Sequence, residues 1–356
     1  MDFRLTQDQR DLRSGIGSLL AGRFDRTRLR AAVDCGGVLD RALWAELRAA
    51  GVFSLRSPEP AGGLGLGLAE AVLVFEELGR SLLPGPLVAT ELAAAAGVTA
   101  PGSALGRAGG SAPGPAGAVA LLRLPQGRGP LLVEQLPSLD LVLLLDPAAG
   151  GVHAVDPAEL SGVARAVRGV DPLTPLWEVT GRLPAGLPVP GVDAGRLWSE
   201  GTLLTAALQV GLAARALDSA VAHAGQREQF GQPIGAFQAV QHLCADMLGR
   251  LEPARVAVRA AAVGLDSAIG TTGTAAVQHG AQAAVEAEVA AAKLLADDAA
   301  VRGARDCLQV HGGMGFTWEA DVHLLLKRAW VWQRSFAGAE ECAETLARQL
   351  LAGGLL

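Results

Sequence analysis

The order of the hydrophobic patterns along the chain is the feature that most narrows its possible folds. In roughly the first hundred residues, apolar side chains recur at helical spacing. Short apolar runs broken by turn residues follow, and these are typical of strands. Long helical patterns then return. Few folds place a compact sheet between two helical segments of this size.

This order predicts an α+β fold that is mainly α. We expect an N-terminal helical domain over 1–100, a small middle β domain over 101–193 and a C-terminal four-helix bundle over 194–356. The expected helices cover 7–20, 41–50, 68–83, 87–96, 196–225, 238–263, 274–310, 324–332 and 340–351. The expected strands cover 119–124, 130–134, 139–145, 152–155, 166–170 and 177–180.

Two local expectations accompany this division. Residues 101–117 are rich in Gly, Pro and Ser, which predicts a loop or linker before the first strand. The helix expected over 68–83 is strongly amphipathic. Its pattern places Val72, Phe75 and Leu78 inward and turns Glu76 and Glu77 outward.

Composition excludes several classes of function. The formal net charge is -6 without a basic patch, so a nucleic-acid partner is not expected. Apolar runs are interrupted before the roughly 20 residues that span a membrane, and the charged first residues lack a signal-peptide core. The cysteines and histidines show no metal-binding spacing. We therefore expect a cytoplasmic protein without a metal and without a membrane partner. Lys293 and Lys327 are its only lysines.

The segment 227–238, Arg-Glu-Gln-Phe-Gly-Gln-Pro-Ile-Gly-Ala-Phe-Gln, lies between two expected long helices. Arg227 follows a helix, so its guanidinium can project from the helix end. This planar, permanently charged fork can bond two oxygens of a pyrophosphate at once, and Phe230 can cover an adenine or a ribose. A structural interpretation stays open, in which Arg227 binds helix C-terminal carbonyls and Phe230 packs in the core.

A second segment, Gln-Val-His-Gly-Gly-Met-Gly-Phe at 309–316, ends the longest expected helix. Paired glycines allow the backbone to approach a ligand closely. Gln309 offers both a donor and an acceptor to the edge of a nucleobase. A plain loop that ends the helix explains the same residues, and the residues alone do not decide between the two.

These two segments resemble the C-terminal signatures of the acyl-CoA dehydrogenase family. An N-terminal stretch, Pro-Glu-Pro-Ala-Gly-Gly-Leu-Gly at 58–65 followed by Phe-Glu-Glu-Leu-Gly-Arg at 75–80, is similar to a third signature. The order of helices, strands and helices matches that fold as well. Three signatures in order are much more specific than any one of them.

The resemblance implies an FAD-dependent enzyme that carries out α,β-dehydrogenation of an acyl-CoA thioester. In that family the Arg segment reaches across a subunit interface to the FAD pyrophosphate of a neighbour. The Gln-Gly-Gly segment contacts the adenosine end. Carried over to this chain, the implied cofactor-binding residues are Arg227, Gln229, Phe230, Gln238, Gln309, Gly312 and Gly313.

The resemblance also indicates what is missing. The family removes the α proton with an Asp or Glu while hydride leaves the β carbon for the flavin. Many members carry this base in a Tyr-Glu-Gly segment, and this chain has Phe336, Ala337 and Gly338 there. Ala337 cannot abstract a proton.

Other members carry the base on an earlier helix, at the place of Gly201 in this chain. Glu200 is one residue away, which rotates it by about 100° around a helix. Glu200 can act as the base only if the helix is shifted in register relative to the family's helix. We therefore expect no catalytic residue here, with Glu200 as the remaining candidate. Glu340 and Glu341 are expected in the first turn of the last helix, where acids favour the dipole.

The expected middle domain departs from the family as well. Members usually show a Thr-Glu…Gly-Ser-Asp stretch that holds the flavin ring and acyl-CoA, and 118–183 has no equivalent. The chain resembles a subunit of the hetero-oligomeric actinobacterial enzymes, some of which act on sterol side chains. This resemblance implies a heterotetramer. A paralogous catalytic partner contributes the carboxylate and the ring-binding strands, and this chain contributes Arg227 and Gln309.

Two alternatives stay open. One is a self-sufficient homo-oligomeric acyl-CoA dehydrogenase with an unusual base, for which Glu200 is the first candidate. The other is a flavin-free scaffold on the same fold. The sequence leaves the acyl group open, and it does not decide whether electrons pass to an electron-transfer flavoprotein or to oxygen.

Overall fold

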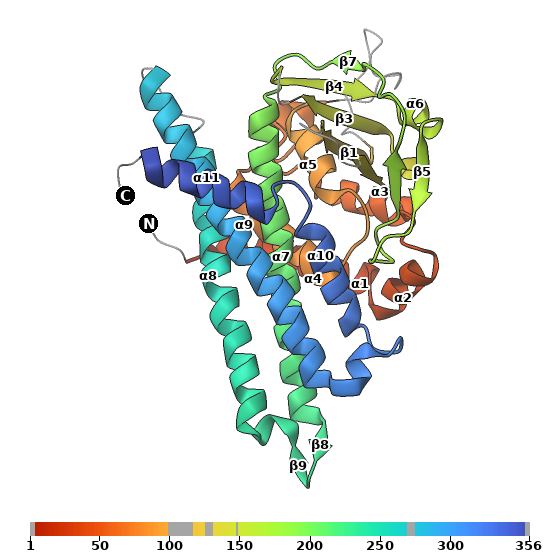
Figure 1. Cartoon of the computed structure of the whole chain (residues 1–356), viewed down its shortest axis with the longest axis vertical. Coiled ribbons are helices and arrows are strands. Elements are labelled where there is room, and N and C mark those ends of the chain that lie inside the picture. Colours follow the sequence, from red (N-terminus) through yellow and green to blue (C-terminus); the bar gives the residue numbers. More distant parts are fainter. Residues whose placement is uncertain (1–3, 99–116, 125–130, 147–148, 269–274, 353–356) are drawn as a thin grey trace. The chain divides into compact units, whose positions relative to one another are not determined.

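The structure, a computed structural model, describes residues 4–98, 117–124, 131–146, 149–268 and 275–352 (Figure 1). Within these ranges the chain is mainly helical with small sheets, which confirms the predicted fold class. The linker expected over 101–117 lies outside the described residues apart from Gly117.

The helices follow the predicted pattern closely. Asp40 begins α3, because its carboxylate accepts hydrogen bonds from the backbone N–H groups of Ala42 and Leu43. Two described helices, α2 and the short α6, were not expected. The helices are α1 (Gln7–Arg23), α2 (Arg26–Asp34), α3 (Arg41–Ala49), α4 (Leu68–Ser81), α5 (Leu87–Ala95), α6 (Pro157–Ser161), α7 (Ala194–Gln226), α8 (Gln238–Ala268), α9 (Ala275–His311), α10 (Val322–Trp332) and α11 (Ala339–Ala352).

The strands of the middle segment form two sheets. One has the order β1-β3-β4-β7, with β1 parallel to β3, and the other has the antiparallel order β2-β6-β5. Residues 141–145 of β3 are buried, as their unbroken apolar run predicts for a strand covered on both faces. The strands are β1 (Val119–Arg123), β2 (Leu131–Glu134), β3 (Leu141–Asp146), β4 (Gly151–Val155), β5 (Ala164–Val167), β6 (Leu176–Val179) and β7 (Leu187–Pro188).

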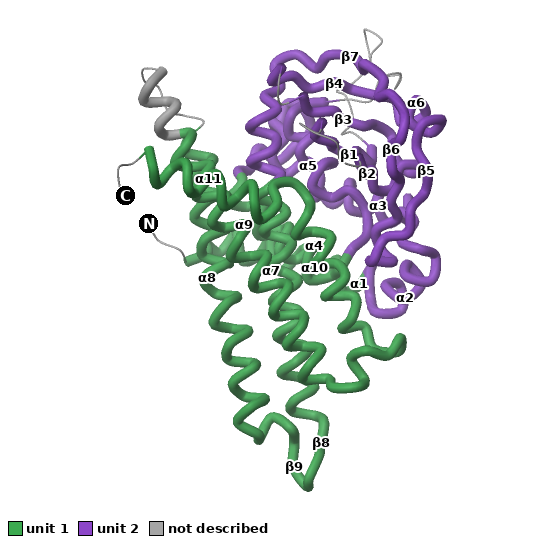
Figure 2. The backbone as a smooth tube through the Cα atoms, viewed as in Figure 1, with its two compact units in different colours: residues 1–22, 68–82, 202–356 green, residues 23–67, 83–201 purple. Residues whose placement is uncertain are grey.

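The chain divides into two compact units (Figure 2). Unit 1 comprises Met1–Gly22, Leu68–Leu82 and Thr202–Leu356. Unit 2 comprises Arg23–Gly67 and Leu83–Gly201, and it contains the two sheets described above. The three-domain boundaries expected from the sequence stay a prediction.

In unit 1, α4 and α7 cross at backbone contact. A Cβ added to Gly211 of α7 would lie 1.8 Å from the carbonyl oxygen of Glu76 on α4. A Cβ added to Gly79 would lie 2.1 Å from the carbonyl oxygen of Leu208. Both distances are far shorter than any real contact, so these two positions require glycine. Close approach of the helices therefore depends on glycine here, in addition to their small alanine side chains.

Glu76 corrects one sequence expectation. It was expected to face solvent, but it is 3% exposed. Its carboxylate accepts hydrogen bonds from Arg13 of α1 (3.2 Å) and from Arg255 (2.9 Å) and Arg259 (3.4 Å) of α8. Neighbouring helices cover both sides of α4, so a charged residue on its outer face becomes the centre of an ion-pair cluster.

Within the described ranges, no helix combines the length and the apolar character that crossing a membrane requires.

Candidate functional site

The segment predicted to bind a pyrophosphate forms a short hairpin where α7 leads into α8 (Figure 1). Its strands are β8 (Glu228–Gln229) and β9 (Gln232–Pro233). The two residues between them, Phe230 and Gly231, have φ angles of 53° and 78°. Positive φ at both central residues is the geometry of a type I′ turn, which matches the twist of a two-residue hairpin.

Phe230 does not fit the interpretation in which this segment has a purely structural role. Its side chain is 93% exposed, so it does not pack in the core of this chain. Its only described ring contact is an edge-to-face arrangement with Phe237, at 6.1 Å between ring centroids. A left-handed backbone conformation is unfavourable for a bulky side chain, and so is exposure of a whole aromatic ring. The turn accounts for the backbone conformation, but the exposure of the ring is not explained by the folding of this chain.

Arg227 is anchored by its backbone, while its side chain is exposed. Its N–H donates to the carbonyl of His223 (2.8 Å), and its carbonyl accepts from Ile234 (2.8 Å). Its guanidinium makes no hydrogen bond or ion pair with any residue that the structure describes. Gln229 and Gln238, at the two ends of the same hairpin region, are exposed as well. The guanidinium is thus available to an anionic ligand.

The second predicted segment begins in the last turn of α9 and continues through a 3-10 helix, Gly312–Phe316. Gln309, Gly312 and Gly313 are exposed. Gly312 has φ 59°, which explains a glycine at that position. Gly313 does not have positive φ, and a Cβ added there would meet no atom of this chain within 4 Å. Its backbone is therefore open to close approach by a ligand.

The two segments are far apart in the sequence but lie side by side in unit 1. The rings of His223 on α7 and His311 on α9 stack with centroids 4.1 Å apart and planes 20° from parallel. His223 lies one turn before Arg227, and His311 lies between Gln309 and the paired glycines. The fold thereby joins the site that the sequence predicts as two separate pieces.

These residues fit the pyrophosphate and adenosine end of a dinucleotide. They offer an unpaired guanidinium for phosphate oxygens, an exposed aromatic ring for a base, an exposed amide for a base edge, and open glycine backbone. They include no group for the redox-active ring.

Ala337, at the position matched to the family's glutamate, lies in the turn between α10 and α11 and is 7% exposed. Its N–H donates to Thr202 Oγ1 (3.4 Å), and its carbonyl accepts from the Cys342 thiol (3.9 Å). This turn is thus held by its backbone, with a methyl group in place of a carboxylate.

Glu200, the remaining candidate base, lies in unit 2, and the residue is only 3% exposed. One oxygen accepts from Arg56 Nη1 (2.8 Å), and the other accepts from Arg196 Nε (2.7 Å). Arg56 also forms a two-bond pair with Glu91, at 2.8 and 3.0 Å. Burial opposes the charge of Arg56, but the two carboxylates outweigh it and raise its pKa. Both oxygens of Glu200 are therefore occupied by guanidinium groups.

A buried ionic cluster in unit 1 was missed by sequence reasoning. Lys293 is 0% exposed, and its Nζ lies 2.6 Å from Asp297 Oδ2. The same Nζ donates to the carbonyls of Trp332 (3.2 Å) and Gln333 (3.4 Å) at the end of α10. Burial raises the pKa of Asp297, while Lys293 and Gln209 act in the opposite direction. The available signal was the rarity of lysine in a chain rich in arginine.

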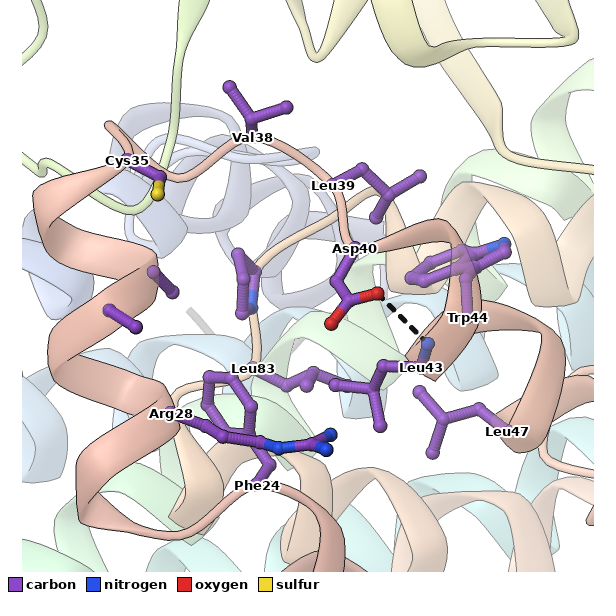
Figure 3. A pocket seen from close by; sticks show the side chains of 13 residues that line it. Phe24, Arg28, Cys35, Val38, Leu39, Asp40, Leu43, Trp44, Leu47 and Leu83 are labelled. Carbon is purple, nitrogen blue, oxygen red and sulfur yellow. Dashed lines mark hydrogen bonds between the residues drawn. The ribbon is translucent and has the colours of Figure 1, made fainter.

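A pocket of about 470 Å³ lies elsewhere, in unit 2 among α2, α3 and the residues before α5 (Figure 3). Apolar side chains such as Phe24, Leu43 and Leu83 line it. Its volume is typical of small-molecule sites. However, its two charged side chains are engaged in the fold. Asp40 caps α3, and Arg28 Nη1 donates to the carbonyl of Arg23 (2.9 Å). None of the predicted site residues lines this pocket.

Comparison with known families gives two matches. Residues 198–351 match the model for the acyl-CoA dehydrogenase C-terminal domain, and residues 6–105 match the model for the N-terminal domain.

Individual proteins agree with these matches. Acyl-CoA dehydrogenase IpdE2 of Mycobacterium tuberculosis is 32% identical over 91% of this chain and 91% of its own length. Acyl-CoA dehydrogenase FadE34 of the same organism is 36% identical over 81% of this chain, which spans only 39% of that relative. Among solved structures, a chain of the ChsE4-ChsE5 complex from Mycobacterium tuberculosis superposes with a TM-score of 0.75 at 25% identity, covering 99% of both chains.

Proposed function

Because this chain belongs to the acyl-CoA dehydrogenase family, we propose that it is the FAD-contacting, non-catalytic subunit of a hetero-oligomeric acyl-CoA dehydrogenase. The single observation that carries the proposal is the exposure of Arg227 and Phe230 on a strained hairpin. Both side chains are exposed in this chain, and they suit a dinucleotide held at an interface.

The roles of the two subunits follow from what the dehydrogenation reaction requires. When bound, FAD supplies the hydride acceptor for α,β-dehydrogenation of an acyl-CoA thioester. Arg227 would hold the pyrophosphate, Phe230 would cover the adenosine, and Gln309 would bond the edge of the base. The reaction also needs a carboxylate that removes the α proton. With Ala337 at the family's usual position, the partner must provide that carboxylate.

The solved ChsE4-ChsE5 complex supports an assembly of unlike chains, since one of its chains covers nearly the whole of this one at 25% identity. We infer a paralogous partner that carries the glutamate and the Gly-Ser-Asp stretch absent here.

The test is to purify the chain alone and together with such a paralogue. The lone chain should be colourless and inactive, and the pair should be yellow and should oxidise an acyl-CoA thioester. A lone chain that purifies with flavin and reduces it with acyl-CoA contradicts the proposal. A pair that forms without flavin supports the scaffold function instead.

Glu200→Gln separates this proposal from a self-sufficient enzyme. The amide keeps the shape of the side chain but weakens its bonds to Arg56 and Arg196, so we expect the free energy of unfolding to fall by about 1–3 kcal/mol. Turnover of the assembled pair should be unchanged. Glu91→Gln is the matched control, because Glu91 bonds the same arginine and is not a candidate base. Loss of turnover with Glu200→Gln alone would identify Glu200 as the base.

A further inference from the structure

The stacked imidazoles connect the two cofactor segments. His311 Nδ1 lies 2.8 Å from the Cys307 carbonyl oxygen, so a proton on Nδ1 is donated to that carbonyl and fixes the ring on α9. His223 stacks on this fixed ring at 4.1 Å. The carbonyl of His223 also accepts the N–H of Arg227 (2.8 Å). His223 is thus in contact with both segments, through its ring on one side and its backbone on the other.

We propose that His223 is a positioning residue for Arg227, and that its stack on His311 holds the two segments together only while the His223 ring is uncharged. The consequence for the flavin rests on the proposed function, because it requires that Arg227 bind the dinucleotide. The coupling of the hairpin to the end of α9 does not depend on flavin.

Charged and titratable groups on α7, α8 and α9 lie in the same region as the pair. Arg227 stands at the end of α7, and Asp306 on α9 is paired with Arg250 of α8. The neighbouring thiols remain neutral, because burial raises the pKa of Cys307 to about 12 and also raises the pKa of Cys244 on α8. His223 is therefore the titrating group on which the proposal rests.

The sign of the effect follows from the pKa of His223. Burial lowers it below the ordinary 6.5, and His311 and Arg227 lower it further. The unfolded or opened hairpin therefore binds more protons than the closed one below that pH. The contribution of the stack to stability is complete above pH 6.5 and is lost as the pH falls below it.

Hydrogen–deuterium exchange of the full chain tests the coupling directly. The informative amides are that of Arg227, which bonds the His223 carbonyl at the end of α7, and that of Ile234, which closes the hairpin. After correction for intrinsic exchange, we expect their protection to fall about tenfold or more between about pH 7.5 and about pH 5.5. In His223→Phe the ring still stacks but takes no proton, so protection should be equal at both pH values. In His223→Ala the protection of these amides should be low at both pH values.

The control is His242→Phe, which removes an exposed histidine of α8 outside the stack and should keep the wild-type acid response. An equal acid response in His223→Phe and wild type would overturn the proposal. So would full protection in His223→Ala. In the assembled pair, acid should accelerate flavin release from the wild type but not from His223→Phe. If exchange behaves as predicted while Arg227→Ala retains flavin, the positioning role stands and the proposed function fails.

Discussion

Asp297→Ala should lower the free energy of unfolding by about 3–5 kcal/mol, because it leaves the ammonium group of Lys293 buried without its carboxylate. Lys293 is fully buried, and the carbonyls of Trp332 and Gln333 can accept hydrogen bonds but cannot neutralise its charge. The measurement is a urea unfolding titration of the full chain. Since the same ammonium group binds the end of α10, the turn that carries Ala337 should lose order at the same time.

Two further variants make this prediction specific. Asp298→Ala removes the adjacent carboxylate, which pairs with Arg302 on the exposed side of α9, and it should cost only about 0.5 kcal/mol. The double variant Lys293→Met with Asp297→Ala should recover part of the lost stability, because it leaves no unpaired charge in the buried site. If Asp297→Ala costs no more than Asp298→Ala, the ion pair is not a structural element of the core.

Gly211→Ala should be the second severely destabilising change, with a loss of about 3 kcal/mol or failure to fold. The new methyl group would lie 1.8 Å from the carbonyl oxygen of Glu76, and only separation of α4 from α7 relieves that overlap. Separation would also disturb the arginine cluster around Glu76. Unfolding titrations again give the measurement.

Gly225→Ala is the matched control on the same helix. A Cβ added to Gly225 would meet no atom within 4 Å, and alanine is the better helix former. This variant should therefore be neutral or should raise stability by up to about 1 kcal/mol. Equal stability of Gly211→Ala and wild type would mean that α4 and α7 do not cross as closely as described.

Much of the fold could be predicted from the sequence, because the long helices carry clear apolar periodicity and end at recognisable residues. The predicted α9, for example, differs from the described helix by one residue at each end. The helix α2 was missed, since arginines fill its short sequence and hide the periodicity. Its start was nevertheless marked by Asp25, whose side chain accepts from the N–H of Arg28. Glu76 was misjudged because a helical pattern does not reveal which faces neighbouring helices cover.

The candidate site could be predicted only as two pieces. Residue types suggested that Arg227 suits a pyrophosphate and Gln309 suits a base, and the family resemblance assigned those roles. No local pattern could reveal that His223 stacks on His311, because that contact depends on how α7 packs beside α9. Exposure of Phe230 likewise required the fold, since an aromatic residue between two helices suggests the core equally well.

The most direct test of the split site is the flavin content of the assembled pair carrying Arg227→Ala. Loss of the charged bonds to the pyrophosphate should weaken flavin binding about 10- to 100-fold, so the purified pair should be largely colourless. Arg302→Ala, which removes an exposed arginine of α9 away from the hairpin, should keep the wild-type flavin content. A pair with Arg227→Ala that retains its full complement of flavin would contradict the account.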